Sequence, residues 1–225
     1  MLTRHNLVWL SADGWQRAAQ TVAADCRATL ERWRQEDWPL VLRRREADTP
    51  EHELCLGLAL PPDGNGDKLR IPLRAQLADV ERIEEPLTLR QALAHMPAGW
   101  SGPLRAFAGD CLHSGIALRL YGSWAWQVLT RQNYVTAASD IDLLFAPRST
   151  LEFSRGMALL AQHAARLPLD GEVIFPDGRA VAWKECWQAM QAGAEGGIVA
   201  RVLVKTAVSV QLSTLASLIA SLEPA

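Results

Sequence analysis

Two aspartates separated by one residue lie at the start of an apolar run near the middle of the chain. The segment reads Ser139-Asp140-Ile141-Asp142-Leu143-Leu144-Phe145, and its apolar run is typical of a strand. Side chains alternate between the two faces of a strand, so Asp140 and Asp142 would point the same way. Two neighbouring carboxylates repel each other unless a cation lies between them. The spacing therefore predicts a site for one or two Mg²⁺ ions, with Mn²⁺ as the alternative.

A glycine–serine pair precedes these aspartates. Gly122 and Ser123 follow the apolar run 116–120 and begin a segment typical of a helix. Glycine lets the backbone approach a phosphate closely, and a serine hydroxyl and the first N–H groups of a helix donate to phosphate oxygens. Together with the aspartates, the pair predicts metal-dependent phosphoryl or nucleotidyl transfer. The competing interpretation is a surface strand with an incidental turn.

A third carboxylate is expected on a neighbouring strand. Glu172 fits best because it precedes the apolar pair Val173-Ile174, and Asp170 is the alternative. Both could instead be exposed acids of a turn. Lys205, in an apolar run, is a candidate for binding pyrophosphate or else an ordinary surface lysine.

Basic and aromatic residues offer further candidates. The run Arg43-Arg44-Arg45 follows the predicted strand 40–42 and could bind substrate phosphates or an acidic protein, or be a solvated strand end. Nine tryptophans are unusual for this length. Trp124 and Trp126 begin the helix beside the predicted site, where core packing is the first interpretation and adenine stacking the second.

The elements that must position these residues form two groups. Residues 1–86 predict a small α+β unit that binds substrate or partner, with strands at 7–10, 40–42, 54–60 and 68–74 and a helix at 18–33. The polar segment 81–86 ends in proline and marks the expected boundary. Residues 87–225 are then the predicted catalytic domain.

In the second group, strands and helices alternate. Helices are predicted at 87–96, 104–113, 123–131, 150–167 and 209–222, and strands at 116–121, 140–145, 171–175, 179–183 and 198–205. This order predicts an α/β (α+β) protein whose second domain is a mixed sheet flanked by helices.

Composition narrows the class of protein. The net charge of −2 gives no case for nucleic-acid binding. The four cysteines match no zinc spacing and are expected to be reduced, mostly buried thiols. We expect no signal peptide and no membrane span, and therefore a cytoplasmic protein.

A family resemblance covers most of the chain. Strand, Gly-Ser, helix, Asp-x-Asp and a later carboxylate resemble the polymerase-β-like nucleotidyltransferase superfamily. The chain is more closely similar to the malonate decarboxylase holo-acyl-carrier-protein synthases, also called phosphoribosyl-dephospho-CoA transferases. The residues that carry this likeness lie at 4–10, 38–44, 121–130, 134, 139–144, 169–172, 175–178 and 183–185. Arg131 departs from the pattern, which has glycine there.

The resemblance implies a specific reaction. A serine of the apo acyl-carrier subunit of malonate decarboxylase attacks triphosphoribosyl-dephospho-CoA, and pyrophosphate leaves. Asp140, Asp142 and Glu172 would bind the metal, and Gly122 and Ser123 would hold the leaving phosphates. The alternatives are a related enzyme that uses an ordinary nucleoside triphosphate and a non-catalytic binding module on the same fold.

Overall fold

The chain folds into two compact units in a computed structural model that describes residues 2–194 and 200–224. The N-terminal unit comprises Met1–Pro86 and Trp126–Tyr134, and the C-terminal unit comprises Leu87–Ala125 and Val135–Ala225. This differs from the two continuous domains that the sequence predicts, because the segment 126–134 packs with the first unit. The fold is α+β, as predicted from the sequence.

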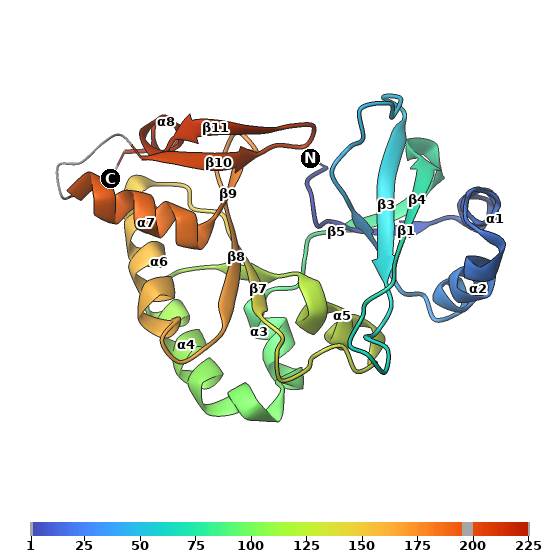
Figure 1. Cartoon of the computed structure of the whole chain (residues 1–225), viewed down its shortest axis with the longest axis horizontal. Coiled ribbons are helices and arrows are strands. Elements are labelled where there is room, and N and C mark those ends of the chain that lie inside the picture. The colour runs from blue at the N-terminus through green and yellow to red at the C-terminus, as the bar shows by residue number, and fades with distance from the viewer. Residues whose placement is uncertain (1, 195–199, 225) are drawn as a thin grey trace. The chain divides into compact units, whose positions relative to one another are not determined.

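The N-terminal unit contains a five-stranded antiparallel sheet in the order β4-β3-β2-β1-β5. Its strands are β1 (Leu7–Leu10), β2 (Leu40–Leu42), β3 (Glu53–Ala59), β4 (Arg70–Gln76) and β5 (Val80–Glu84). The helices are α1 (Ala12–Thr21) and α2 (Arg27–Gln35). In Figure 1 these strands and helices run in colour from blue through cyan to green.

Two features of this unit differ from the sequence prediction. The single helix predicted at 18–33 is two helices, because the Ser11 hydroxyl caps an earlier start and Val22 is extended. The prediction failed because the apolar spacing from Val22 to Trp33 continues across the break. Strand β5 was not predicted. It is a mostly exposed edge strand beside β1 and therefore lacks apolar alternation.

The segment 126–134 contributes to the core of the N-terminal unit. Trp126 lies edge-to-face against Trp33, and its ring stacks with that of Tyr134. The Tyr134 hydroxyl donates to the carbonyl of Ala59. Arg131 adopts a φ of 60°, a left-handed conformation that suits glycine. A glycine would adopt this conformation without strain, which is consistent with the glycine that the family pattern has at position 131.

The C-terminal unit contains a six-stranded mixed sheet in the order β11-β10-β9-β8-β7-β6. Its strands are β6 (Leu118–Leu120), β7 (Ile141–Phe145), β8 (Leu169–Ile174), β9 (Ala180–Ala182), β10 (Arg201–Lys205) and β11 (Val210–Thr214). Its helices are α3 (Leu89–Ala92), α4 (Ser101–His113), α6 (Thr150–His163), α7 (Trp183–Ala194) and α8 (Leu215–Ile219). Helix α5 (Gly122–Thr130) begins in this unit. β7 and β8 run parallel, and the other neighbouring strands are antiparallel.

The C-terminal third departs most from the predicted elements. Helix α7 was not predicted, and β11 occupies the start of the helix predicted at 209–222. Residues 198 and 199 of the strand predicted at 198–205 lie outside the described residues, and β10 begins at Arg201. Val210–Thr214 becomes a strand because it pairs along its whole length with β10. Tertiary pairing of this kind overrides local helical spacing.

Helices cover one face of the six-stranded sheet. In Figure 1, α6 and α7 lie on the same side of β7 and β8. Gly156 of α6 leaves room for the Phe145 ring, since an added Cβ would lie 2.2 Å from it. Ile141 and Leu143 face this layer and are buried, as predicted. No helix in the described part of the chain is long and apolar enough to cross a membrane.

Candidate active site

The register of two parallel strands gathers carboxylates on the face of the sheet opposite these helices. Asp142 of β7 is directly paired with Asp170 of β8, and Leu144 is paired with Glu172. Residues two apart in a strand share a face, so Asp142, Asp170 and Glu172 lie on one side. Neighbouring strands are about 4.8 Å apart, which places the two aspartates side by side. The sequence predicted that a neighbouring strand supplies a third carboxylate. The register shows that Asp170, rather than Glu172, is paired directly with Asp142.

Gly122 provides the space that the Asp142 carboxylate occupies. Its φ is +70°, and an added Cβ would lie 1.9 Å from Oδ2 of Asp142. The N–H of the preceding Tyr121 donates to the Asp142 carbonyl at 3.1 Å. A glycine is therefore required here for both its conformation and its size. The beginning of α5 and the carboxylate are consequently in direct contact. The sequence predicted phosphate binding for Gly122 and metal binding for Asp142, but not this contact.

Asp140 lies immediately before β7, where its side chain is exposed. The preceding turn is held by Ser139, whose hydroxyl accepts from the Thr136 N–H at 2.9 Å and whose N–H donates to the Thr136 carbonyl at 3.1 Å. Ser139 is itself buried. The turn thus fixes the backbone from which Asp140 projects at the end of the sheet.

Glu172 and Lys205 form a largely buried ion pair. The Lys205 ammonium lies 3.0 Å from Oε1 of Glu172, whose side chain is only 6% exposed. A carboxylate with so little water around it needs a nearby cation. The cation for Glu172 comes from β10, two strands away. The sequence predicted metal binding for Glu172 and pyrophosphate binding for Lys205, without a contact between them. The structure shows that the two side chains are in contact.

Two further basic residues of this region were missed in the sequence. Lys184 lies at the start of α7 with its ammonium 3.5 Å from Oδ1 of Asp170. Arg119 of β6 is paired with Leu144 and therefore lies in the same row as Glu172. The signal for Arg119 was a charge between two buried leucines in a short strand. Lys184 lies in the segment 183–185 that carries the family resemblance, but it was given no role in the site, and α7 itself was not predicted.

The chemistry of these side chains suits a hard cation. Asp140, Asp142, Asp170 and Glu172 offer oxygen donors, the ligands that Mg²⁺ and Mn²⁺ prefer. Within residues 2–194 and 200–224, no three His, Cys, Asp or Glu side chains are already arranged as a metal site. Mg²⁺ usually takes one or two protein carboxylates and completes its shell with waters and substrate phosphates. The residues present therefore fit Mg²⁺ bound together with a phosphorylated substrate.

The three consecutive arginines of the N-terminal unit behave differently from one another. Arg43 donates to the Leu56 carbonyl and to Glu46, each at 2.8 Å. Arg45 donates twice to the Thr49 carbonyl. Arg44 is exposed. Two of the three predicted phosphate-binding residues thus stabilise local structure, and Arg44 is the most accessible of them.

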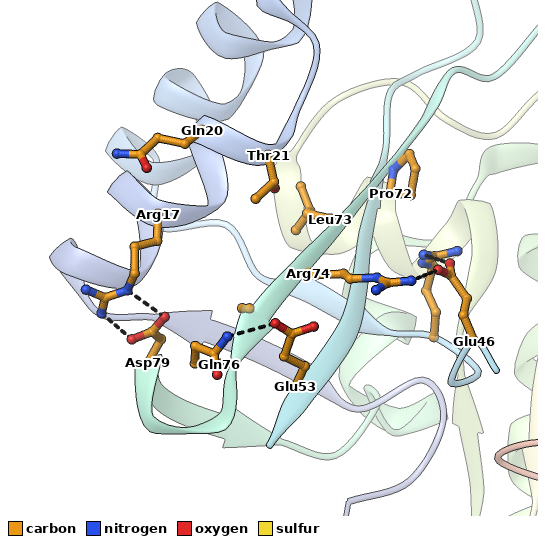
Figure 2. Close-up of a pocket in the computed structure, with 12 residues that line it drawn as sticks. Arg17, Gln20, Thr21, Glu46, Glu53, Pro72, Leu73, Arg74, Gln76 and Asp79 are labelled. Carbon is orange, nitrogen blue, oxygen red and sulfur yellow. Dashed lines mark hydrogen bonds and ion pairs between the residues drawn. The ribbon is translucent and has the colours of Figure 1, made fainter. Parts of the chain in front are cut away.

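A groove of about 590 Å³ lies in the N-terminal unit, between α1 and the strands β3 and β4. Figure 2 shows that its charged side chains point toward one another. Arg17 binds both carboxylate oxygens of Asp79, and Arg74 bridges to Glu46 at 2.7 Å. The Arg17 guanidinium lowers the pKa of the Asp79 carboxyl through these hydrogen bonds. The groove is therefore lined by paired charges.

The tryptophans beside the site are core residues, as first interpreted. Trp124 is fully buried, and its indole N–H donates to the His95 carbonyl at 3.1 Å. Trp126 is buried in the core of the N-terminal unit. Cys55, Cys111 and Cys186 are buried free thiols, as predicted, and Cys26 is partly buried. Burial raises the pKa of Cys111 and Cys186 to about 12.

The α+β fold, its acidic sheet face and the comparison with known proteins define a transferase. Residues 3–86 match the family model described as phosphoribosyl-dephospho-CoA transferase MdcG N-terminal domain, and residues 88–216 match the corresponding C-terminal domain. The chain belongs to the phosphoribosyl-dephospho-CoA transferase family.

Curated relatives support the same assignment. The chain is 38% identical to the phosphoribosyl-dephospho-CoA transferase of Bradyrhizobium diazoefficiens, over 81% of this chain and 80% of the relative. It is 35% identical to the protein of that name from Xanthomonas campestris pv. campestris, over 82% of this chain and 85% of the relative. No solved structure gives a significant match.

Proposed function

We propose that this transferase moves the phosphoribosyl-dephospho-CoA group from triphosphoribosyl-dephospho-CoA to a serine of the apo acyl-carrier subunit of malonate decarboxylase. The family supports the group that is transferred. The observation that carries the chemistry is the contact of the Asp142 carboxylate with the backbone at Gly122, with Asp170 directly opposite. This contact brings a carboxylate and the N-terminus of a nine-residue helix to one point. Such a point suits a phosphate accompanied by a divalent cation.

The proposed metal ligands are Asp140 and Asp142, with a third carboxylate from β8. Bound Mg²⁺ or Mn²⁺ would neutralise the charge that develops on the transferring phosphate. The pairing of Asp170 with Asp142 supports Asp170 as the third ligand. The ion pair of Glu172 with Lys205 supports a different role for Glu172, in which it orients the ammonium toward the leaving phosphates. Direct binding of the metal by Glu172 stays a prediction. The variants Asp170→Asn and Glu172→Gln distinguish it from a role of Glu172 in orienting Lys205.

The remaining steps fall to protein groups near the glycine turn. The Ser123 side chain and the first N–H groups of α5 would donate to the leaving phosphates. The serine oxygen of the carrier forms a bond to the α-phosphorus, and the bond between that phosphorus and the pyrophosphate oxygen breaks. The serine proton passes to a carboxylate of the acidic face, which is the sheet face that carries Asp142, Asp170 and Glu172, and pyrophosphate leaves. Positioning and electrostatic stabilisation supply most of the rate enhancement in such reactions.

Arg44 is a further candidate for substrate binding. It is the exposed member of the triple arginine, whereas Arg43 and Arg45 donate to local carbonyls. We propose that Arg44 contacts a phosphate of the substrate or an acidic side chain of the carrier. Arg43 would then act by holding this segment in place.

Mass spectrometry of the apo carrier subunit tests the proposal. After incubation with enzyme, Mg²⁺ and triphosphoribosyl-dephospho-CoA, the carrier should gain one phosphoribosyl-dephospho-CoA group on a serine, with one pyrophosphate released. ATP in place of the CoA derivative should give no adenylylated carrier. Efficient adenylylation with ATP would overturn the proposed substrate, and an unchanged carrier mass would overturn the proposed reaction.

Two variants separate the possible third ligands. Asp170→Asn should raise the Mg²⁺ concentration needed for half-maximal transfer, because it removes a ligand. Glu172→Gln should instead raise the KM for triphosphoribosyl-dephospho-CoA, because Lys205 loses its anchor. The reverse pattern would assign metal binding to Glu172.

A further inference from the structure

The hairpin formed by β10 and β11 exposes a group of apolar side chains. Leu203 is 40% exposed, Val208 68%, Val210 43% and Leu212 55%. Leu203 and Leu212 are directly paired across the two strands, so they form one continuous surface. Monomeric soluble proteins rarely expose large contiguous apolar patches except at interaction sites. β11 is also the edge strand of its sheet, a position that usually avoids exposed apolar side chains.

Of these side chains, Leu203, Val210 and Leu212 lie on the same face of the sheet as the carboxylates of the candidate active site. Glu172 is paired with Ala182, and Ala180 is paired with Lys205, so all four residues share a face. The hairpin face consists of the β10 and β11 residues on that same side: Arg201, Leu203, Lys205, Val210, Leu212 and Thr214. In β10, the residues between them, Val202 and Val204, are fully buried on the side of the helices. The acidic face and the hairpin face are therefore two ends of one surface.

Both charged residues of the hairpin face, Arg201 and Lys205, are basic. Lys205 is paired with Glu172, and the Glu185 carboxylate of α7 accepts from the Leu203 N–H at 2.7 Å, so Arg201 is the main source of positive charge. The chain contains no Asp or Glu from residue 201 to residue 222. Arg201 is exposed, and Lys205 is partly exposed beside Glu172. An apolar centre with basic residues around it is complementary to an apolar surface with acidic residues around it. A small polar metabolite does not present such a surface, whereas a protein does.

We propose that the hairpin face is the docking surface for the acceptor protein, through an apolar and acidic patch next to the acceptor serine. This inference rests on the proposed function, since it assumes that the acceptor is a carrier protein. Four strand spacings of about 4.8 Å separate β11 from β7, so the hairpin lies about 19 Å from Asp142. A domain of roughly 100 residues has a radius of gyration of about 13 Å. A carrier centred over the hairpin therefore reaches the carboxylates with its own edge.

Paired leucine substitutions test this inference. Leu212 on the hairpin and Leu112 at the end of α4 are both exposed leucines of the same unit, at 55% and 84%. Leu212→Glu and Leu112→Glu make the same chemical change, and both should fold, as judged by circular dichroism and thermal unfolding. Leu212→Glu should weaken binding of the apo carrier subunit at least tenfold, measured by isothermal titration with a carrier whose acceptor serine is alanine. Leu112→Glu should leave that affinity within twofold of the parent protein.

A charge reversal at Arg201 gives a second, independent test of carrier docking. Arg201→Glu should weaken carrier binding and reduce its dependence on salt, while Arg105→Glu on the surface of α4 should do neither. Neither Leu212→Glu nor Arg201→Glu should change the affinity for triphosphoribosyl-dephospho-CoA. Equal carrier affinities for Leu212→Glu and Leu112→Glu would overturn the docking inference.

Other outcomes identify a different occupant of the hairpin face. Weaker binding of triphosphoribosyl-dephospho-CoA by Leu212→Glu would assign the face to the pantetheine arm and overturn carrier docking. Loss of a dimer on gel filtration would assign it to a second copy of this chain. If the parent enzyme modifies the carrier while Leu212→Glu behaves as Leu112→Glu does, only the docking inference fails. If the parent enzyme neither binds nor modifies the carrier, the proposed function fails and the docking inference fails with it.

Discussion

The two units of this protein arrange their carboxylates differently. In the groove of the N-terminal unit, guanidinium groups meet carboxylates directly, as Arg17 meets Asp79 and Arg74 meets Glu46. On the sheet face of the C-terminal unit, the carboxylates lie beside one another, although Lys184 and Lys205 also pair with two of them. Asp142 and Asp170 are directly paired across β7 and β8.

The difference separates charges that stabilise structure from charges suited to chemistry. An arginine and a carboxylate that satisfy each other gain stability and have little capacity left for a ligand. Neighbouring carboxylates repel, and a fold that holds them together stores electrostatic energy that a bound cation can relieve. Variants of the acidic face should therefore affect transfer, whereas variants of the groove should affect stability.

The first prediction concerns the acidic face. Asp142→Asn should lower the rate of carrier modification at least about 1000-fold while the protein stays folded, because an amide cannot replace a metal-binding carboxylate. Asp67→Asn makes the same change at an exposed turn of the N-terminal unit and should leave the rate unchanged. Mass spectrometry over a time course measures both rates. Similar rates for the two variants would remove the catalytic role of the acidic face.

The second prediction concerns the glycine turn. Gly122→Ala should lower the transfer rate about 100-fold, because the new methyl group displaces the Asp142 carboxylate. Gly178→Ala is the matched control, since its φ of +81° is similar but nothing lies within 4 Å of the added Cβ. The control should lose about 1 kcal/mol of stability from backbone strain alone and keep its activity. An active Gly122→Ala enzyme would show that the contact with Asp142 is dispensable.

The third prediction concerns the buried ion pair of the acidic face. Lys205→Met should lower the free energy of unfolding by about 1–3 kcal/mol, because Glu172 loses a cation in a site with little water. The double variant Glu172→Gln/Lys205→Met should recover much of that loss. Arg34→Met breaks an exposed pair with Glu31 in the N-terminal unit and should have a much smaller effect. Urea denaturation of these three variants, of Glu172→Gln alone and of the parent protein gives the comparison, and additive losses in the double variant would argue against coupling.

The fourth and smallest prediction concerns pH and the groove of the N-terminal unit. Arg17 lowers the pKa of Asp79 in the folded protein, so the pair stabilises the fold fully above the unfolded carboxyl pKa of about 3.9. That stabilisation is lost as the pH falls through the lower folded pKa. Arg17→Met should therefore be less stable than the parent at neutral pH, and the difference should vanish in acid. A difference that persisted at low pH would mean that Arg17 acts mainly through packing.

Much of the fold could be predicted from local patterns. Strands β1, β2 and β7 and helix α6 occur close to where apolar runs and helical spacing placed them. One failure arose because tertiary pairing decides between local alternatives. Val210–Thr214 forms a strand because β10 offers it a complete partner. Helix α7 was missed because it follows directly on the strand β9, without a turn signal between them.

The candidate site was predicted in part. Asp142 and Gly122 could be linked from sequence because the pattern that joins them is local and specific. The choice between Asp170 and Glu172 could not, since both fit the same predicted strand and only its register against β7 distinguishes them. Arg119 was missed because a single cation in an apolar run has no periodicity to mark it, and Lys184 because the helix α7 that carries it was not predicted.

The sequence alone determined the residue types of the site, the kind of chemistry they suit and the family to which the chain is similar. These features depend on motifs that are short and contiguous. The tertiary structure decided which carboxylates become neighbours, that Lys205 pairs with Glu172, and that the hairpin face continues the acidic face. Each of these depends on strand order and register, which bring together residues far apart in the chain. Only the structure shows that Asp142 has a second carboxylate beside it, from Asp170, and that it packs against Gly122.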